Sequence, residues 1–533
     1  MDRAASIFAS RQPPERPPLP TSLRRWLLFG LAVHLALGAA LGLSVDEAHY
    51  ALYAAHPALS YFDHPPLVGW VQWPLVALGA PDALLRLLPG LLWVLCVVLV
   101  YDITCRLQNA AGASLQEARK AGAWAVALVG LAPLLHILAI GLVPDTLLMV
   151  LHLAVMAQTL RMMASDRPGL GAWLLLGCLL GLAGLSKYTA IFTAVAVLVC
   201  LVPALGLRVL ATPGPWLALG AALLLASPVA IWNAQHDWIS FVYQAQHGAG
   251  GPWSGLHLMR FVLVQLLAYG PLLLVGFWGL RQITMRWRWL LAFFAVPFGV
   301  LAFLSGGGSS LPHWTAPAWV ALVPWAAIAL AGARAGSRQS RSVGGPLLVK
   351  VLVVFQAMCS LALPGLMLSG GMPFLAGRSA SAESSDPPNP FADLHGWDRA
   401  GARAAQLAHE HGLGSVAVQN WTLASRMGWY ARPLPVYVLE NRFDQFDLWA
   451  GDLPVGGRTL LVDWSQMPYA LPLGDHGFAS CTLLAREPIQ HWGYALAEFR
   501  FFDCQGWSGQ PAPRLQTGAS LAAPSGSDNH ATP

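Results

Sequence analysis

The chain has 533 residues, of which 56% are hydrophobic and only 11% are charged. Its mean hydropathy of +0.53 is far above that of a soluble domain of the same length. The formal charge of +5 is not gathered on a basic face of the kind that binds nucleic acid, which excludes that class of function. We therefore expect a membrane protein that crosses the bilayer many times.

The N-terminal segment, residues 1–25, is rich in Pro and Arg. It lacks an apolar core followed by a small-residue cleavage site, as a cleaved signal peptide would have. We predict that residues 1–25 are a cytoplasmic tail and that the first apolar run is retained as a helix.

About eleven apolar runs follow, each long enough to span a hydrocarbon core of roughly 30 Å. They define a transmembrane domain over residues 26–370, and we place them at 26–43, 83–101, 121–140, 146–162, 170–185, 188–205, 215–232, 256–280, 287–304, 314–331 and 346–368. Between the first two runs, the apolar residues 65–80 are interrupted by Pro, Gly and Trp. We predict an interfacial helix there, with a re-entrant segment as the alternative.

Basic residues accumulate in alternate connections between the runs, which predicts a cytoplasmic N-terminus and an extracytoplasmic C-terminal part. On this assignment the short outer connections carry a single basic residue, Lys187. Several polar clusters then share the outer face, and the largest lies in residues 44–70, SVDEAHYALYAAHPALSYFDHPPLVGW. Ionisable groups at the mouth of apolar helices are costly to desolvate and therefore indicate a functional site; a solvated loop is the plain alternative.

The character of the chain changes after residue 370. Residues 371–392 form a Ser/Pro-rich linker, residues 393–504 have the mixed periodicity of a small extracytoplasmic α/β domain, and residues 505–533 have the composition of a disordered tail. Cys481 and Cys504 are the only cysteines of this domain. In an oxidising compartment we expect them to form a disulfide that joins the last two strands.

The outer polar residues suit a reaction on a lipid-borne anionic substrate. In sugar transfer from a polyprenyl phosphate, the phosphate departs without a general acid if cations neutralise its charge, whereas the acceptor hydroxyl needs a base. Asp46 is the candidate general base, and the adjacent Glu47 is an orienting residue or second proton acceptor.

The candidate phosphate-binding cations are Lys187, Arg86 and Arg260. Each of them could instead extend to the lipid headgroups. The remaining outer-face candidates bind sugar or acceptor hydroxyls, or a divalent metal ion as cofactor; they are Asp63, His64, Asp145, His236 and His313. A packed, hydrogen-bonded role is the alternative for the histidines.

The ordered motifs VDEAHY, YFDHPPLVGW, GLVPDT, GLSKYTA and LPHWTAPAW carry a family resemblance. Together they resemble bacterial members of the dolichyl-phosphate-mannose protein mannosyltransferase superfamily, which are polytopic glycosyltransferases of the GT-C type and include the aminoarabinose lipid A transferases. The resemblance implies an inverting transfer of a sugar, hexosyl or pentosyl, from a polyprenyl-phosphate donor. It also implies that Asp46 is the base and that Asp145 is the second acidic outer-loop position.

The same resemblance implies a protein of the bacterial inner membrane that acts at its extracytoplasmic face. The acceptor would be a lipid, glycan or protein of the cell envelope, and the resemblance does not identify which. LHGWDRAG and ENRFDQFDLW in the external domain are similar to the tails of other bacterial members.

Two other functions compete with this interpretation. A lipid transporter or flippase would place ionisable residues at mid-span, where only His136 and His152 occur, and we expect both to be satisfied polar residues. A glycan-binding scaffold without catalytic activity would leave the acidic cluster without a role.

Overall fold

The computed structural model describes residues 18–249, 251–308, 310–333, 346–371 and 389–510. Internal contacts divide the chain into two compact units. The larger one, here called the membrane unit, comprises Met1–Ala40 and Tyr53–Pro364. The smaller one, here called the external unit, comprises Leu41–Leu52 and Gly365–Pro533. The predicted tail 505–533 and linker 371–392 lie largely outside the described residues, as does most of the predicted N-terminal tail.

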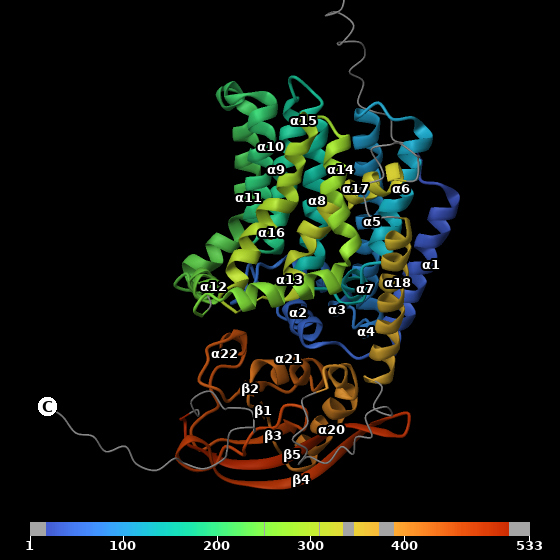
Figure 1. Cartoon of the computed structure of the whole chain (residues 1–533). Helices are drawn as coiled ribbons and strands as arrows, with labels where there is room; N and C mark the ends of the chain where they lie inside the picture. Colours follow the sequence, from blue (N-terminus) through green and yellow to red (C-terminus); the bar gives the residue numbers. More distant parts are fainter. Residues whose placement is uncertain (1–17, 250, 309, 334–345, 372–388, 511–533) are drawn as a thin grey trace, which may run out of the picture. The chain divides into compact units, whose positions relative to one another are not determined.

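Seven helical segments in the described residues are long and apolar enough to cross a membrane. They are labelled in Figure 1 and comprise α1 (Thr21–Ala40), α4 and α5 (Asp82–Leu85 and Leu87–Ala110), α8 (Pro144–Met163), α11 (Pro213–Gln235), α15 and α16 (Met285–Arg288 and Ala292–Ser305), α17 (Ala316–Ala333) and α18 (Pro346–Ser369). Each of them occupies one of the apolar runs predicted from the sequence.

Two of the predicted spans are sharply bent instead of straight. Helix α6 (Leu115–Gly130) meets α7 (Pro133–Ile140) at 72°, and α13 (Gly255–Tyr269) meets the segment Pro271–Gly279 at 98°. In both cases the second part starts with a proline, which cannot donate to the preceding turn. At the second bend Gly270 adopts φ 91°, a value that side-chain-bearing residues rarely adopt.

The remaining predicted runs are shorter helices. Helices α9 (Leu170–Ser186) and α10 (Ala190–Leu205) match the fifth and sixth runs, and α3 (Leu67–Ala77) occupies the stretch predicted to be interfacial. Helix α12 (Ile239–Ala249) follows α11. The fold class expected from the sequence, a polytopic helical membrane protein with a small C-terminal sheet domain, is confirmed.

Glycines allow α9 and α11 to pack closely. A Cβ atom on Gly177 would lie against the backbone carbonyl of Ala218, and one on Gly181 would lie 2.7 Å from the Cβ atom of Leu225. Spaced four residues apart, Gly177 and Gly181 form the small-residue contact that brings membrane helices together.

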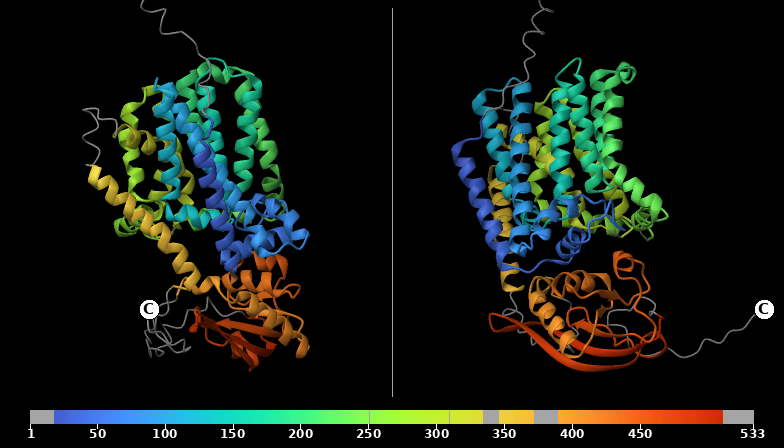
Figure 2. Two further views of the ribbon diagram at one scale, coloured as in Figure 1. Left: turned by 90° about the vertical axis from the view of Figure 1, so that its right-hand side faces the viewer. Right: turned by 180° about the vertical axis from the view of Figure 1, so that it is seen from behind.

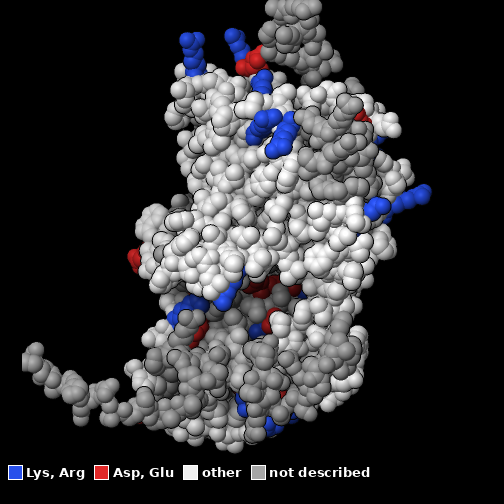
Figure 3. Space-filling model, viewed as in Figure 1, with Lys and Arg blue, Asp and Glu red and all other residues white. Residues whose placement is uncertain are grey.

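The surface of the membrane unit matches a protein embedded in lipid. In the view of Figure 3 it is almost free of Lys, Arg, Asp and Glu over most of its height, and basic side chains gather at one end. Large apolar side chains of the membrane unit, such as Leu223, Leu224 and Leu361, are exposed, as expected for helices that face acyl chains instead of water.

The external unit contains a five-stranded sheet with the strand order β2-β1-β3-β5-β4. Its last two strands are the long red ribbons of Figure 2. The strands are β1 (Val416–Val418), β2 (Val436–Val438), β3 (Arg458–Trp464), β4 (Phe478–His491) and β5 (Tyr494–Trp507), and the helices are α20 (Trp397–Glu410), α21 (Trp421–Tyr430) and α22 (Gln445–Trp449). Strands β1, β2 and β3 are parallel because helices connect them, whereas β4 and β5 form an antiparallel hairpin.

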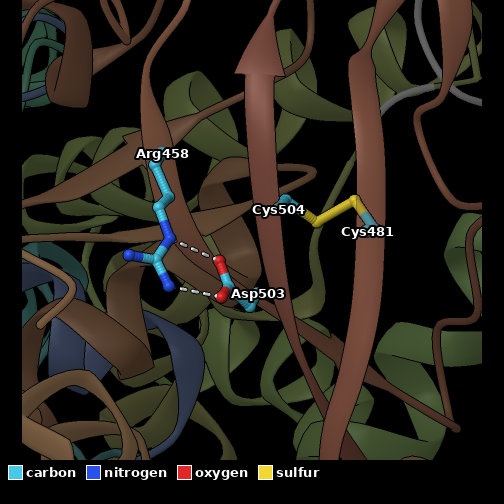
Figure 4. Close-up of a disulfide and its surroundings, with 4 residues drawn as sticks. All are labelled: Arg458, Cys481, Asp503 and Cys504. Atoms are coloured by element: carbon cyan, nitrogen blue, oxygen red, sulfur yellow. Dashed lines mark hydrogen bonds and ion pairs between the residues drawn. A yellow bond between two sulfur atoms is a disulfide. The ribbon is translucent and has the colours of Figure 1, made fainter. Parts of the chain in front are cut away.

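A disulfide links the two strands of that hairpin. Cys481 and Cys504 are paired in the β4–β5 register and their sulfur atoms are bonded at 2.00 Å, which is the pairing expected from the sequence (Figure 4). Beside it, Arg458 on β3 donates two hydrogen bonds to the Asp503 carboxylate on β5, at 2.9 and 2.6 Å. The covalent bond and the ion pair thus fix the register of three neighbouring strands.

Candidate active site

The acidic pair after the first span lies at the start of helix α2 (Val45–Ala55). Glu47 closes the first turn of this helix, because its Oε2 atom accepts hydrogen bonds from the backbone N–H of Ser44 at 3.1 Å and from the Ser44 hydroxyl at 2.9 Å. The Glu47 carboxylate is buried and has a capping role. Asp46, one residue earlier, is half-buried and has no hydrogen bond or close ion pair with any residue that the structure describes.

The beginning of α2 belongs to the external unit and contacts helix α21 there. The Leu43 N–H donates to the Tyr430 hydroxyl at 2.8 Å, and His49 Nδ1 lies 3.1 Å from the Ser425 hydroxyl. Ser425 already donates its proton to the Trp421 carbonyl, so it accepts from His49 Nδ1–H. These contacts fix the segment that carries Asp46.

A buried arginine of α21 lies next to this segment. Arg426 is fully buried and stacks on Trp397 and Trp464, with its guanidinium carbon 3.8 and 5.0 Å from the two ring centroids. It forms an ion pair with Asp393. Burial lowers the pKa of Arg426 well below its ordinary value, and the charge of Asp46 opposes that shift. A cation therefore acts on the carboxylate of Asp46 through space.

In the membrane unit, three of the predicted residues come together; we call Asp145, Lys187 and His313 the Lys187 cluster. The Lys187 ammonium donates to both carboxylate oxygens of Asp145 at 2.8 and 2.6 Å, and His313 Nε2 lies 3.6 Å from Asp145 Oδ2. The ammonium also lies 5.4 Å from the Trp314 ring centroid. Asp145 and Lys187 are both buried, so the cluster is a desolvated ion pair edged by an imidazole and an aromatic ring.

Local structure explains how these residues meet. Asp145 lies in the first turn of α8, where a negative charge interacts favourably with the helix dipole. Lys187 follows the last residue of α9, and the preceding Ser186 donates to the Pro144 carbonyl at 2.7 Å. His313 lies in the short helix η6 (Pro312–Thr315) that leads into α17. Helix ends, each near a polar connection, thus supply every member of the cluster.

The other sequence-predicted residues have separate environments. Asp63 accepts a hydrogen bond from the Tyr53 hydroxyl, and its carbonyl accepts from Gln244 at 2.6 Å. The carbonyl of His64 accepts from the Tyr61 N–H at 3.2 Å. His236 stacks on Trp232 with ring centroids 3.9 Å apart and donates to its carbonyl.

The two candidate arginines differ in burial. Arg86 is buried and donates to the Gly38 carbonyl of α1, and its aliphatic part packs on Gly38. Arg260 is exposed on α13. Lys187, in contrast, lies beside two other predicted site residues, Asp145 and His313.

Within the described part of the chain, no three His, Cys, Asp or Glu side chains are grouped in a way that could hold a metal ion. The histidines inside the helical bundle have protein partners. His152 bonds to Thr193 and to the Phe293 carbonyl at 2.7 and 2.9 Å, and His136 lies 2.9 Å from His34 and 3.0 Å from the Gly130 carbonyl. They are the satisfied polar residues that the sequence predicted.

Sequence reasoning missed the residues that surround the two acidic positions. Arg426, Ser425 and Tyr430 lie hundreds of residues from Asp46 and carry no local signal of their proximity. The capping role of Glu47, in contrast, is visible in the sequence, because Ser44 and Glu47 have the Ser-x-x-Glu spacing of a capping box.

Comparisons with known proteins agree with this architecture. Residues 63–232 match the family model described as dolichyl-phosphate-mannose-protein mannosyltransferase. The chain is 27% identical over 236 residues to the lipid A galacturonosyltransferase RgtD of Rhizobium johnstonii, and 25% identical over 248 residues to the lipopolysaccharide core galacturonosyltransferase RgtA of the same organism. These matches cover 43% and 44% of the chain, which spans about half the length, 47%, of each relative.

Two crystal structures of ArnT from Cupriavidus metallidurans share the fold. The apo structure aligns with a TM-score of 0.58 at 15% identity over 90% of this chain and 98% of that one. The structure bound to undecaprenyl phosphate aligns with a TM-score of 0.56 at 15% identity over 89% of this chain and 98% of that one. The chain therefore shares the fold of these polytopic membrane proteins, and its residues 63–232 are similar to the mannosyltransferase family.

Proposed function

We propose that this protein transfers a sugar from a polyprenyl-phosphate donor to a lipid acceptor of the bacterial envelope, at the extracytoplasmic face of the inner membrane, with Asp46 as general base. In this reaction the acceptor hydroxyl oxygen attacks the anomeric carbon while the bond from that carbon to the phosphate oxygen breaks. The hydroxyl proton passes to the Asp46 carboxylate, and polyprenyl phosphate leaves with the electron pair. The configuration at the anomeric carbon is inverted.

This proposal is supported mainly by the difference in hydrogen bonding between two adjacent carboxylates, those of Asp46 and Glu47. The Glu47 oxygen is committed to the Ser44 N–H and hydroxyl, whereas Asp46 has no such partner in the described structure. Hydrogen bonds to a carboxylate make it a poorer proton acceptor, so Asp46 fits the role of base better than Glu47. We accordingly assign Glu47 to holding the first turn of α2.

The Lys187 cluster supports the donor side of the proposal. A buried ammonium edged by an imidazole is suited to a phosphate whose negative charge increases as the bond to the sugar breaks. Asp145 orients the Lys187 side chain before the donor arrives, and the phosphate would share the ammonium with it. Arg86 and Arg260 are weaker candidates, because the first packs on α1 and the second is exposed on α13.

The names of the relatives bear on the substrates. RgtD and RgtA are galacturonosyltransferases of lipid A and of the lipopolysaccharide core, and an ArnT structure of this fold holds undecaprenyl phosphate. We therefore propose undecaprenyl phosphate as the carrier, a hexuronic acid as the first sugar to test, and a lipid A or core glycolipid as the acceptor class.

The test uses the purified full chain in nanodiscs with a panel of undecaprenyl-phosphate sugars and a lipid A acceptor. Release of undecaprenyl phosphate is measured for the wild type, Asp46→Asn and the matched variant Glu47→Gln. We expect Asp46→Asn to lose at least about a hundredfold in turnover, as removal of a general base does, while Glu47→Gln keeps most of it.

Donor binding, measured by equilibrium titration, separates the proposed role of Lys187 from that of Asp46. Lys187→Met should weaken donor binding, whereas Asp46→Asn should leave it unchanged. Turnover by Asp46→Asn at the wild-type rate would refute the assignment of the base. Absence of donor binding across the panel would refute the transferase itself.

A further inference from the structure

The tip of the β4–β5 hairpin exposes a large aromatic side chain. Trp492 lies in the turn between the two strands, adopts φ 50° and is 64% exposed. Tyr494, which begins β5, is 42% exposed. The Trp492 ring stacks on the neighbouring His491, with the two ring centroids 5.1 Å apart.

The same hairpin tip is bound to the end of a membrane helix. His491 Nε2 donates to the carbonyl of Leu368, in the last turn of α18, at 2.5 Å. His395 donates to the next carbonyl back, that of Met367, at 2.9 Å, and the two imidazole rings lie 4.7 Å apart. These bonds satisfy carbonyl groups that a helix C-terminus leaves without internal partners, so the tip stays beside the helix end.

Exposure along α18 locates the point where this helix leaves the lipid. Val354, Met358 and Leu361 are 57%, 64% and 78% exposed, as lipid-facing side chains are, whereas Met367 and Ser369 are 8% and 2% exposed. The transition falls near residues 364–366. Leu368 lies only about 3 residues beyond it, which is roughly 5 Å along a helix axis. We take this fall in exposure as the edge of the hydrocarbon; a headgroup layer about 5–7 Å thick then includes Leu368, to which the hairpin tip is bonded.

We propose that the hairpin tip inserts Trp492 into the headgroup layer of the leaflet in which α18 ends, and so anchors the external unit to the bilayer surface. Trp and Tyr are the residues that prefer this layer, because the ring packs against the upper methylenes while the N–H or O–H meets water and headgroups. The partner is the phospholipid bilayer itself. The proposal does not depend on the proposed enzymatic activity.

The test places a nitroxide spin label at the tip of the full chain in phospholipid nanodiscs. Cys178 and Cys359, the half-buried free cysteines, are first replaced by Ala; the other free cysteines, Cys96, Cys105 and Cys200, are buried. Trp492→Cys is then labelled, and its collision rates with molecular oxygen and with a water-soluble nickel chelate are compared. Oxygen concentrates in lipid and the chelate in water, so their ratio reports depth.

Val455 provides the matched control. It is 77% exposed, and its neighbour Gly456 donates to the carbonyl of Trp507, which ends β5. Strand β5 has 14 residues and begins beside the hairpin tip, so Val455 lies at the opposite end of a ladder roughly 40 Å long. A label on Val455→Cys should collide with the chelate as a water-exposed site does. The ratio of the oxygen to the chelate collision rate should be at least threefold larger for the label at position 492 than for the label at position 455.

Two results would overturn the proposal. One is a label at position 492 that is as accessible to the nickel chelate as the label at position 455. The other is spin–spin broadening at position 492 that disappears on dilution with unlabelled protein, because the tip would then contact a second copy of the chain. A photo-crosslinking residue at position 492 gives an independent measurement if labelling perturbs the hairpin, and it should crosslink to phospholipid.

Discussion

At the scale of single residues, Asp444 is the group that most directly links pH to stability. It caps α22, since its Oδ1 atom accepts from the Phe446 N–H at 2.7 Å, while its buried Oδ2 atom has no hydrogen-bond partner in the described structure. Burial raises the pKa of Asp444, the Phe446 N–H and His49 oppose that rise, Asp447 and Glu440 add to it, and the resulting pKa is about 7. The carboxyl is therefore protonated in the folded protein at pH values where it is ionised in the unfolded chain.

We predict that the stability around α22 decreases as the pH rises from about 4 to 7, because the folded state then binds a proton that the unfolded state has already released. Asp444→Asn keeps the cap and removes this titrating group, so it should reduce the dependence and protect α22 better than the wild type at pH 8. A smaller dependence remains, because burial also raises the pKa of Asp447 in the same helix. Hydrogen exchange of peptides from α22 in the full chain, corrected for intrinsic rates at pH 5 and pH 8, measures the effect. Asp475→Asn, at an exposed position, serves as control, and equal pH dependence in all three proteins would contradict the prediction.

Individual residues also show how far sequence reasoning reaches within the site. Asp145, Lys187 and His313 were each predicted from their position after or before an apolar run, and they come together because helix ends on one side of a bundle are neighbours. The predicted pairing of Cys481 with Cys504 has the same origin, since the last two strands form a hairpin. Glu47 is predicted to be an orienting residue or second proton acceptor, and its spacing from Ser44 also indicates the cap that the structure contains.

At the scale of elements, close contact between α9 and α11 depends on glycine. Gly177→Ala would force a methyl group against the Ala218 carbonyl, and a backbone carbonyl cannot move aside as a flexible side chain does. We predict a destabilisation of about 1–3 kcal/mol, typical of overpacking. Thermal denaturation of the detergent-solubilised protein would show it as a lower midpoint.

Gly220, on α11, gives the opposite expectation for the same substitution. A Cβ atom there would meet open space, and alanine favours a helix by up to about 1 kcal/mol relative to glycine. Gly220→Ala should therefore leave the midpoint unchanged or raise it. If both variants shift the midpoint equally, the close contact between α9 and α11 does not contribute to stability in the way predicted here.

Elements differ in how well the sequence predicts them. The predicted apolar runs coincide with helices of the membrane unit, because hydrophobic length and period are local properties of the chain. The bends at Pro133 and Pro271 were not predicted, since a continuous apolar run gives no sign of whether a proline kinks a span or divides it. Tertiary packing decides between these outcomes.

At the scale of the whole molecule, the division into units does not follow the chain. Leu41–Leu52, which directly follows the first span, belongs by its contacts to the external unit, whose other residues begin at Gly365. The sequence near either segment does not predict a contact between two segments so far apart in the chain. The external unit thus contains the proposed base, and the membrane unit contains the Lys187 cluster.

This division predicts that contacts of the external unit control the chemical step and not donor binding. The double variant Ser425→Ala and Tyr430→Phe removes the hydrogen bonds of α21 to His49 and Leu43, each worth about 1 kcal/mol, without touching Asp46. We expect faster hydrogen exchange in the peptide covering residues 41–52 and a turnover reduced about tenfold, with donor affinity unchanged. Turnover falls because a base that samples several positions is less often aligned with the acceptor hydroxyl.

Thr422→Ala is the control on the same helix, because its hydroxyl bonds to Asn420 within the external sheet domain and not to the Asp46 segment. It should leave both the exchange of residues 41–52 and the turnover at wild-type values. If the double variant accelerates exchange but leaves turnover intact, the position of Asp46 does not limit the reaction. If it instead weakens donor affinity, the external unit takes part in holding the donor, and the separation of roles between the two units is wrong.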